Sequence, residues 1–271
     1  MTKRLEAAFE RAKSESRGAL GIFISAGDPH PEVTPGLMDA LVENGADFIE
    51  LGMPFSDPMA DGPAIQAASL RAIKAGTTLE STLAIARDFR SRHPEVPLIL
   101  MGYYNPIYIY GNDRFLKEAA AAGVDGLIIV DLPVEEDDEL CLPAQEEGID
   151  FIRLVTPTTQ GERLKRVLDS SSGFIYYVAV AGITGTKSAS TDSIKEAMDR
   201  IHAVSDLPAV VGFGIRTPEQ AAEAGQFGSG VVVGSAVVDI IAKGADSGTE
   251  GATIIQEVGA FCGSLSAALK K

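Results

Sequence analysis

The sequence predicts an α/β fold, a single-domain (β/α)8 TIM barrel that spans residues 1–271. Three observations favour this fold. Eight short apolar runs alternate with stretches of helical periodicity. One short motif recurs in front of several of these runs. The length of 271 residues also matches the size of such barrels, which is typically about 250 residues.

The recurring motif joins a glycine, a short turn with a small or acidic residue, and a run rich in β-branched residues. Clear copies lie at 44–52, 122–131 and 147–155, and a looser one at 226–235. In each copy the glycine is expected to end a helix in the left-handed conformation, and a strand follows. Helix, glycine and strand repeated at roughly 25 to 30 residues indicate stacked βα units and a parallel sheet.

The expected strands are apolar on both faces, as strands should be when helices cover one side and a barrel interior lies on the other. They begin near Ala19, Phe48, Pro97, Gly126, Phe151, Phe174, Ala209 and Gly230. A helix precedes the first strand, because charged and apolar residues alternate there at helical spacing. Other helices are expected at 114–122, 135–147, 163–170, 191–203 and 218–224.

Two intervals complete the predicted barrel. The longest, between the second and third strands, predicts an extended loop and an extra helix. The polar stretch 244–251 separates the last barrel helix from a closing helix that ends at Lys271. An open doubly wound sheet is the alternative fold, but no GxGxxG motif follows the first strand.

Composition and charge exclude several classes of protein. The net charge of −15 and the sequence pI near 4.6 disfavour binding to nucleic acid or to anionic lipid. Cys141 and Cys262 are too few for a disulfide framework and favour a reducing compartment. The N-terminus has no signal-peptide core, and no apolar run approaches the roughly eighteen residues of a membrane span. We therefore expect a cytoplasmic protein that binds neither nucleic acid nor membrane.

Two carboxylates in the segment 49–62 are the candidate catalytic residues. Glu50 lies in a short apolar run, and Asp61 ends the Gly- and Pro-rich loop that follows. A satisfied buried carboxylate and a loop cap are the alternative. Glu50 is expected to end the second strand, at the rim where such barrels carry active sites, which favours catalysis. Asp28 and Asp131 follow other strands at this rim, and each is equally compatible with a functional role and with a structural one as a helix cap or a loop tie.

Glycine-rich loops follow the sixth, seventh and eighth predicted strands, at 182–188, 212–218 and 234–236. Gly214 lets the backbone approach an anion closely. Gly234 and Ser235 open an apolar helix whose free N–H groups point outward. One such turn is common in any protein, but three on successive strands predict a phosphorylated ligand.

Two absences in the sequence narrow the reaction. His30, His93 and His202 are scattered without metal-ligand spacing, and no predicted strand ends in lysine. Metal-dependent and Schiff-base aldolases are therefore disfavoured. A phosphosugar lyase without these groups needs a substrate that supplies its own electron sink. Two carboxylates then suffice, one to deliver a proton and one to stabilise the resulting cation.

From Glu50 the chain reads Glu-Leu-Gly-Met-Pro-Phe-Ser-Asp-Pro-Met-Ala-Asp-Gly, a long and specific pattern. On these residues it closely resembles the α-subunit family of tryptophan synthase, and the resemblance runs nearly end to end. Other segments also match the family, in the same order along the chain, at 27–29, 100–105, 131–136, 182–185, 212–215 and 234–236.

The resemblance implies a retro-aldol cleavage of indole-3-glycerol phosphate to indole and glyceraldehyde 3-phosphate. It makes Glu50 the general acid/base at indole C3 and the glycerol hydroxyl, and Asp61 the carboxylate that binds the indole N–H. The implied substrate-binding residues are Phe23, Leu100, Tyr176, Thr184, Gly185, Phe213, Gly214, Gly234 and Ser235. The first two would pack on the indole ring, and Tyr176 would lie near the glycerol chain. Thr184 would belong to a loop that closes over the substrate, and the glycines with Ser235 would bind the phosphate.

The resemblance also implies a partner, a β subunit that carries pyridoxal phosphate, in an α2β2 heterotetramer. This chain itself is expected to bind no cofactor and no metal. Pro54, Pro58 and their neighbours in the loop after the second strand would face the partner. Two other functions stay open: a free-standing indole-3-glycerol-phosphate lyase, and a non-catalytic phosphate-binding subunit that only activates a partner.

Overall fold

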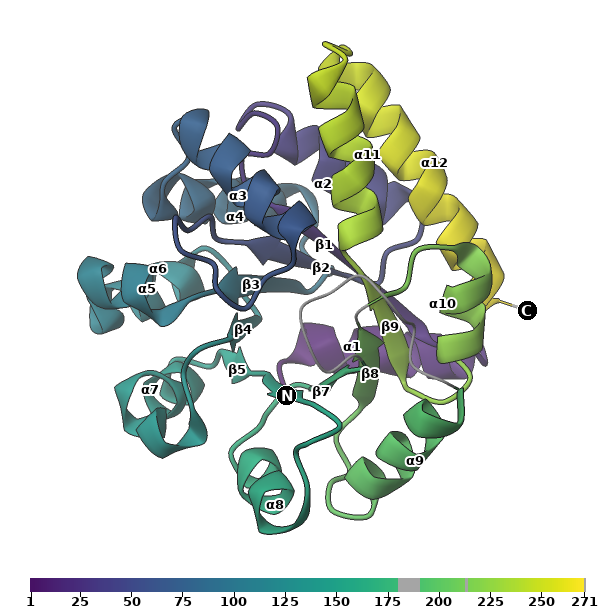
Figure 1. Cartoon of the computed structure of the whole chain (residues 1–271). Helices are drawn as coiled ribbons and strands as arrows, with labels where there is room; N and C mark the ends of the chain where they lie inside the picture. Colours follow the sequence, from purple (N-terminus) through teal and green to yellow (C-terminus); the bar gives the residue numbers. More distant parts are fainter. Residues whose placement is uncertain (180–190, 213, 271) are drawn as a thin grey trace.

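The chain forms a ring of parallel strands with helices around the outside (Figure 1). The computed structural model describes residues 1–179, 191–212 and 214–270. Neighbouring strands follow the order β5-β4-β3-β2-β1-β9-β8-β7-β6. Their bounds are β1 Ala19–Ser25, β2 Phe48–Gly52, β3 Leu98–Gly102, β4 Gly126–Ile129, β5 Asp150–Phe151, β6 Arg153–Val155, β7 Ile175–Val178, β8 Ala209–Gly212 and β9 Gly230–Val233. The predicted barrel is confirmed, with strand starts within one residue of those expected.

The fifth barrel strand is broken into β5 and β6, and the nearly closed sheet has its two ends at this break. β5 pairs with β4, whereas β6 pairs with β7. Between them, the N–H of Ile152 donates to the carbonyl of Leu127 at 2.9 Å. The nine strand segments of the described residues therefore correspond to the eight predicted strands.

Helices follow the strands in the order that the sequence indicates. Their bounds are α1 Lys3–Ser14, α2 Thr34–Glu43, α3 Pro63–Lys74, α4 Leu79–Arg92, α5 Tyr104–Tyr110, α6 Asn112–Ala121, α7 Cys141–Glu146, α8 Gly161–Asp169, α9 Thr191–His202, α10 Pro218–Ala224, α11 Ser235–Asp246 and α12 Gly251–Leu269. The extra helices α1 and α3 are both present, and α3 follows the extended loop after β2. The predicted separator at 244–251 begins inside α11, so it is shorter than expected.

The single helix expected at 135–147 is wrong. The chain forms a 3₁₀ helix, η1 Val134–Glu139, and then α7 after a break at Leu140. Pro143 lies in the first turn of α7, where its missing N–H costs nothing. In one continuous helix its ring would clash with the carbonyl of residue 139, so the helix must restart.

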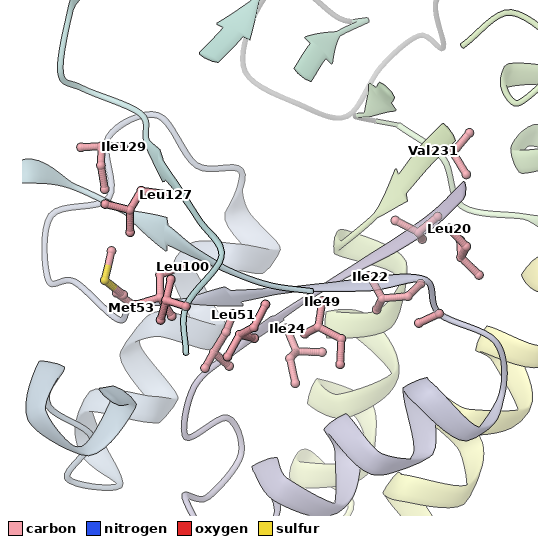
Figure 2. Packing of buried hydrophobic residues seen from close by; sticks show 14 of the residues in the cluster. Leu20, Ile22, Ile24, Ile49, Leu51, Met53, Leu100, Leu127, Ile129 and Val231 are labelled. Carbon is pink, nitrogen blue, oxygen red and sulfur yellow. The ribbon is translucent and has the colours of Figure 1, made fainter. Parts of the chain in front are cut away.

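Side chains from the strands form two apolar layers. Ile22, Ile49 and Leu51 belong to the outer cluster, which packs under the surrounding helices (Figure 2). The alternate residues face the barrel interior, where Phe48 and Phe174 lie with ring centroids 5.4 Å apart. Leu5, Phe9 and Ala12 of α1 join this inner cluster and cover one end of the barrel.

α12 is the one helix of the described residues that is long and apolar enough to cross a membrane. Its contacts give it a different place, because it packs along α2, α10 and α11 at the outside of the barrel (Figure 1). Ile254, Val258, Cys262 and Leu265 are buried there. α12 is therefore the closing helix that the sequence predicts.

Candidate active site

Glu50 lies in the middle of β2 and points into the barrel. Its register partners are Phe23 of β1 and Ile99 of β3. The side chain is completely buried, and within the described part of the chain neither carboxylate oxygen has a hydrogen-bond partner. Burial raises the pKa of Glu50 to about 8. The expectation that Glu50 ends the strand is wrong, because β2 continues to Gly52.

Asp61 ends the loop that follows β2. Its N–H donates to the carbonyl of Pro58 at 3.1 Å, and its carboxylate is hydrogen-bonded to the hydroxyl of Tyr103. Burial raises the pKa of Asp61 to about 6, and the bond to Tyr103 opposes part of this rise. At neutral pH the two acids therefore differ, with Glu50 mainly protonated and Asp61 mainly ionised.

A small cavity lies beside Asp61, between the ends of β1, β2 and β3 and the start of α3. Its lining residues are Phe23, Ser25, Gly52, Met53, Asp61, Ile65, Ser69, Met101, Gly102, Tyr103 and Val130. Most of this wall is apolar, with one carboxylate and three hydroxyl groups. The cavity has a volume of only about 10 Å³, but the chemistry of its wall matches an apolar ligand that carries an N–H group.

Leu100 does not line this cavity, which corrects the assignment drawn from the family resemblance. It is completely buried in the outer cluster, where Figure 2 shows it with Leu51 and Met53. The next residue, Met101, lines the cavity instead. Successive side chains of a strand point to opposite faces, so an assignment that is off by one position puts the side chain outside the barrel.

Tyr176 of β7 belongs to the inner cluster of the barrel. Its ring lies against Gly212 of β8, where an added methyl group would come within 2.3 Å of the Tyr176 hydroxyl oxygen. Burial raises the pKa of Tyr176 far above its ordinary value, and the charge of Glu50 adds to the rise. Tyr176 therefore stays protonated in the same interior as Glu50.

Three of the predicted binding residues lie outside the described residues: Thr184, Gly185 and Phe213. Gly214 is described and exposed, with a φ of +84° that favours glycine. Gly234 precedes α11, and Ser235 is the first residue of that helix. A Cβ atom on Gly234 would lie 3.3 Å from the Cβ of Phe23, so the start of α11 is next to a cavity-lining residue. Free N–H groups in the first turn of α11 can bind an anion there.

Two further rim acids hold loops in place. Asp28 is completely buried and accepts two hydrogen bonds from Arg71 of α3, at 2.7 and 2.9 Å. Asp131 is exposed and accepts the N–H of Tyr104 at 2.8 Å. Both contacts are structural: Asp28 ties its loop to α3, and Asp131 binds the first N–H of α5.

Sequence reasoning missed several residues of the cavity wall. Met101 could have been found from its spacing, because it is two residues after Ile99 and shares the inner face of β3. Tyr103, Ser25 and Ser69 carry no such signal, because their hydroxyl groups meet at the cavity only after three separate segments pack together.

The chain has counterparts among known proteins. A family model described as "Tryptophan synthase alpha chain" matches residues 9–270. This chain belongs to that family. A tryptophan synthase subunit alpha from Legionella pneumophila str. Paris is 40% identical, with a TM-score of 0.90 and coverage of 99% of this chain and 98% of that one. The tryptophan synthase of Mycobacterium tuberculosis matches at 35% identity and a TM-score of 0.89, covering 100% of both chains.

Membership of the tryptophan synthase alpha family makes this chain a carbon–carbon lyase that cleaves indole-3-glycerol phosphate. Alpha chains of this family need no cofactor of their own and work with a β subunit. In the ranges that the structure describes, no three His, Cys, Asp or Glu side chains are grouped as a metal site would require.

Proposed function

We propose that the chain cleaves indole-3-glycerol phosphate at this cavity by a retro-aldol reaction driven by Asp61, which lines the cavity, and by Glu50, which lies in the barrel beside Phe23 of the cavity wall. A completely buried Glu50 and a partly buried Asp61, neither with a positively charged partner among the described residues, are the observation that carries the proposal. Buried acids elsewhere in the barrel bind arginines or backbone N–H groups. A pair left without counter-charges is suited to proton transfer.

Glu50 is the general acid and base of the proposed reaction. Its raised pKa keeps it protonated at neutral pH, so it can protonate indole C3 and form an indolenine cation. A carboxylate then remains in an apolar interior, where it is a strong base for the hydroxyl proton of the glycerol chain. As that O–H becomes a carbonyl, the carbon–carbon bond to C3 breaks. Its electrons return to the ring, which leaves indole and glyceraldehyde 3-phosphate.

Asp61 stabilises the cation between these two proton transfers. Ionised near neutral pH, it is placed at the cavity to accept a hydrogen bond from the indole N–H. As the ring becomes positively charged, this charge-assisted bond strengthens. A carboxylate fixed before the reaction therefore stabilises the cation more than the neutral substrate.

Other residues bind the rest of the substrate. Phe23 packs on the indole ring, and Met101 takes the place first assigned to Leu100. Tyr176 lies near the glycerol chain. The N–H groups at Gly234 and Ser235 bind the phosphate. We also assign phosphate or loop contacts to Gly185, Gly214, Thr184 and Phe213.

Indole release from indole-3-glycerol phosphate tests these roles. We expect Glu50→Gln and Asp61→Asn each to lower kcat by at least about a hundredfold, since each removes a group that acts in the transition state. The rate should decline below pH 6, where Asp61 is protonated, and above pH 8, where Glu50 is ionised. Asp131→Asn, at an exposed rim acid, is the matched control and should stay near wild type. Full activity in Glu50→Gln would refute the mechanism.

We further propose that the chain works in the cytoplasm as the α subunit of an α2β2 complex, with pyridoxal phosphate on the β subunit. Pro58 is buried and Pro54 is partly buried, so neither is well exposed for contact with the β subunit. We therefore expect their exposed neighbours to make that contact. Met59 of this loop is 72% exposed, and Ile109 of α5 is 76% exposed. Large apolar side chains so exposed are typical of protein interfaces.

Titration with the β subunit tests this surface. Ile109→Lys should weaken the complex at least tenfold, because it puts a charge into an apolar contact. Lys165→Ile, on the exposed face of α8, is the matched control and should bind like wild type. If Ile109→Lys bound the β subunit normally, this face would not be the interface. High activity of the isolated chain would instead favour a free-standing lyase.

A further inference from the structure

Tyr103 is a buried residue at the rim, and its side chain contacts the loop that carries Asp61. It directly follows β3 and is 3% exposed. The N–H of Ala60 donates to its hydroxyl oxygen at 2.9 Å. The ring also packs on Phe55, with centroids 5.4 Å apart. One side chain therefore holds the loop at two points along its length.

The Tyr103 hydroxyl and the Asp61 carboxylate line the same cavity, and the hydroxyl lowers the pKa of Asp61 as a hydrogen-bond donor. Its oxygen already accepts the N–H of Ala60, so its own hydrogen can be donated to the carboxylate. A hydrogen bond donated to a carboxylate favours the ionised form. Burial, together with the negative charge of Asp61, raises the pKa of Tyr103, so this hydrogen is retained at neutral pH.

The barrel itself sets the position of Tyr103. The N–H of Met53 donates to the carbonyl of Met101 at 2.8 Å, which joins β2 to β3 just below the tyrosine. The N–H of Val130 donates to the carbonyl of Gly102 at 3.0 Å and joins the next strand. Over the part of the chain that is described, hydrogen bonds from loop residues 54–61 to any other strand end reach only Tyr103. The loop therefore takes its position on the barrel from this residue.

We propose that Tyr103 is a positioning residue that directs the Asp61 carboxylate into the cavity and favours its ionised form. This inference rests on the role proposed above for Asp61. A carboxylate accepts several hydrogen bonds, so Asp61 can bind the Tyr103 hydroxyl and a ring N–H together. The acids on the surrounding elements are Glu50 of β2, Asp57 of the loop and Asp131 after β4. No cation among the described residues acts on Asp61, so the Tyr103 hydroxyl is the described group that opposes the rise in the Asp61 pKa caused by burial.

Tyr103→Phe in the full chain is the sharpest test, because it keeps the ring and its packing on Phe55 and removes only the hydroxyl. The ionisation midpoint of Asp61 is read by NMR on protein labelled at the aspartate carboxyl carbons, and Asp61→Asn identifies the signal. We expect the midpoint to rise by about one pH unit, the size of one hydrogen bond to a charged group. The acid limb of kcat/KM should move by the same amount. At a pH above both midpoints, kcat/KM should remain about threefold to tenfold low, because Asp61 is less well positioned.

Tyr104→Phe is the matched control. The hydroxyl of Tyr104 also donates to a carboxylate, that of Glu139 at 2.8 Å, but away from the cavity. We expect it to leave the Asp61 midpoint and the acid limb unchanged. A Tyr103→Phe protein with lower stability but an unmoved midpoint would overturn the proposal, as would an equal shift in Tyr104→Phe. The NMR midpoint needs no turnover, so a failure to cleave indole-3-glycerol phosphate would refute the function separately.

Discussion

Asp47 and Glu50 are three residues apart at β2, and both are buried, yet their surroundings are opposite. Asp47 accepts hydrogen bonds from Arg17, from Arg11 at 2.9 Å and from the N–H of Leu20 at 2.9 Å. Burial alone would raise the pKa of Asp47, but these donors outweigh it and the pKa is lowered. Glu50 lacks any such partner within the described residues, and its pKa rises.

The same contrast extends around the two ends of the barrel. Asp125 precedes β4, binds Arg90 at 2.7 Å and Arg4 at 2.8 Å, and accepts the N–H of Leu98. Asp150 begins β5 and accepts the N–H of Thr2. With Asp47, these are the aspartates of the recurring motif. They hold α1 and its neighbours to the end of the barrel where the strands begin, which we call the lower end. The comparison teaches that burial alone does not mark an acid for catalysis, whereas the acid proposed for proton transfer is buried without a positively charged partner.

Asp47→Ala is expected to have the largest effect, a loss of stability at the lower end of the barrel without a loss of activity. Arg17 would stay buried with only the exposed Glu15 as a carboxylate partner, and removing one partner of a buried pair costs about 3–5 kcal/mol of unfolding free energy. Urea denaturation measures this cost. The folded protein should keep nearly wild-type kcat, because Asp47 lies away from the cavity.

Asp169→Asn is the control for Asp47→Ala. Its carboxylate pairs with Lys165 on the exposed face of α8, where the loss should be within about 0.5 kcal/mol. Equal losses in both variants would contradict the claim that the lower end is stabilised by its buried pairs.

A second prediction concerns stability and pH at Glu50. The folded pKa of about 8 exceeds the ordinary value of 4.5, so the folded chain keeps a proton that the unfolded chain loses. Wild type should therefore lose stability as pH rises from about 4.5 to about 8, on the order of 4 kcal/mol. Glu50→Gln has no such proton. Its unfolding free energy should match wild type near pH 5 and exceed it near pH 8.5, and parallel urea curves at both pH values would disprove this.

Arg11→Gln should have the smallest effect. The Arg11 side chain is 48% exposed, and Arg17 still neutralises Asp47 when Arg11 is removed. We expect a loss of less than about 1 kcal/mol that shrinks as salt is added. Denaturation at low and high ionic strength measures it. A salt-independent loss as large as that of Asp47→Ala would mean that Arg11, and not Arg17, is the main partner.

Much of the barrel follows from short-range patterns. The glycine–aspartate motif and the apolar runs predict strand starts to within one residue, because helices and strands each leave a periodic pattern in neighbouring residues. The helix expected at 135–147 failed because Pro143 forces a restart that helical periodicity does not show. The break in the fifth strand at Ile152 also left no local signal, because it depends on which neighbour each half pairs with.

The sequence by itself determined the fold class and the family and pointed to the two acids of the proposed site, because each depends on residues close together in the chain. Only the tertiary structure decided that Met101, and not Leu100, faces the cavity, since one residue along a strand reverses the face. It alone showed that Asp47 is paired while Glu50 is not, and that Tyr103 reaches Asp61. These properties depend on contacts between distant segments, and such contacts set whether a buried charge is stabilised or left reactive.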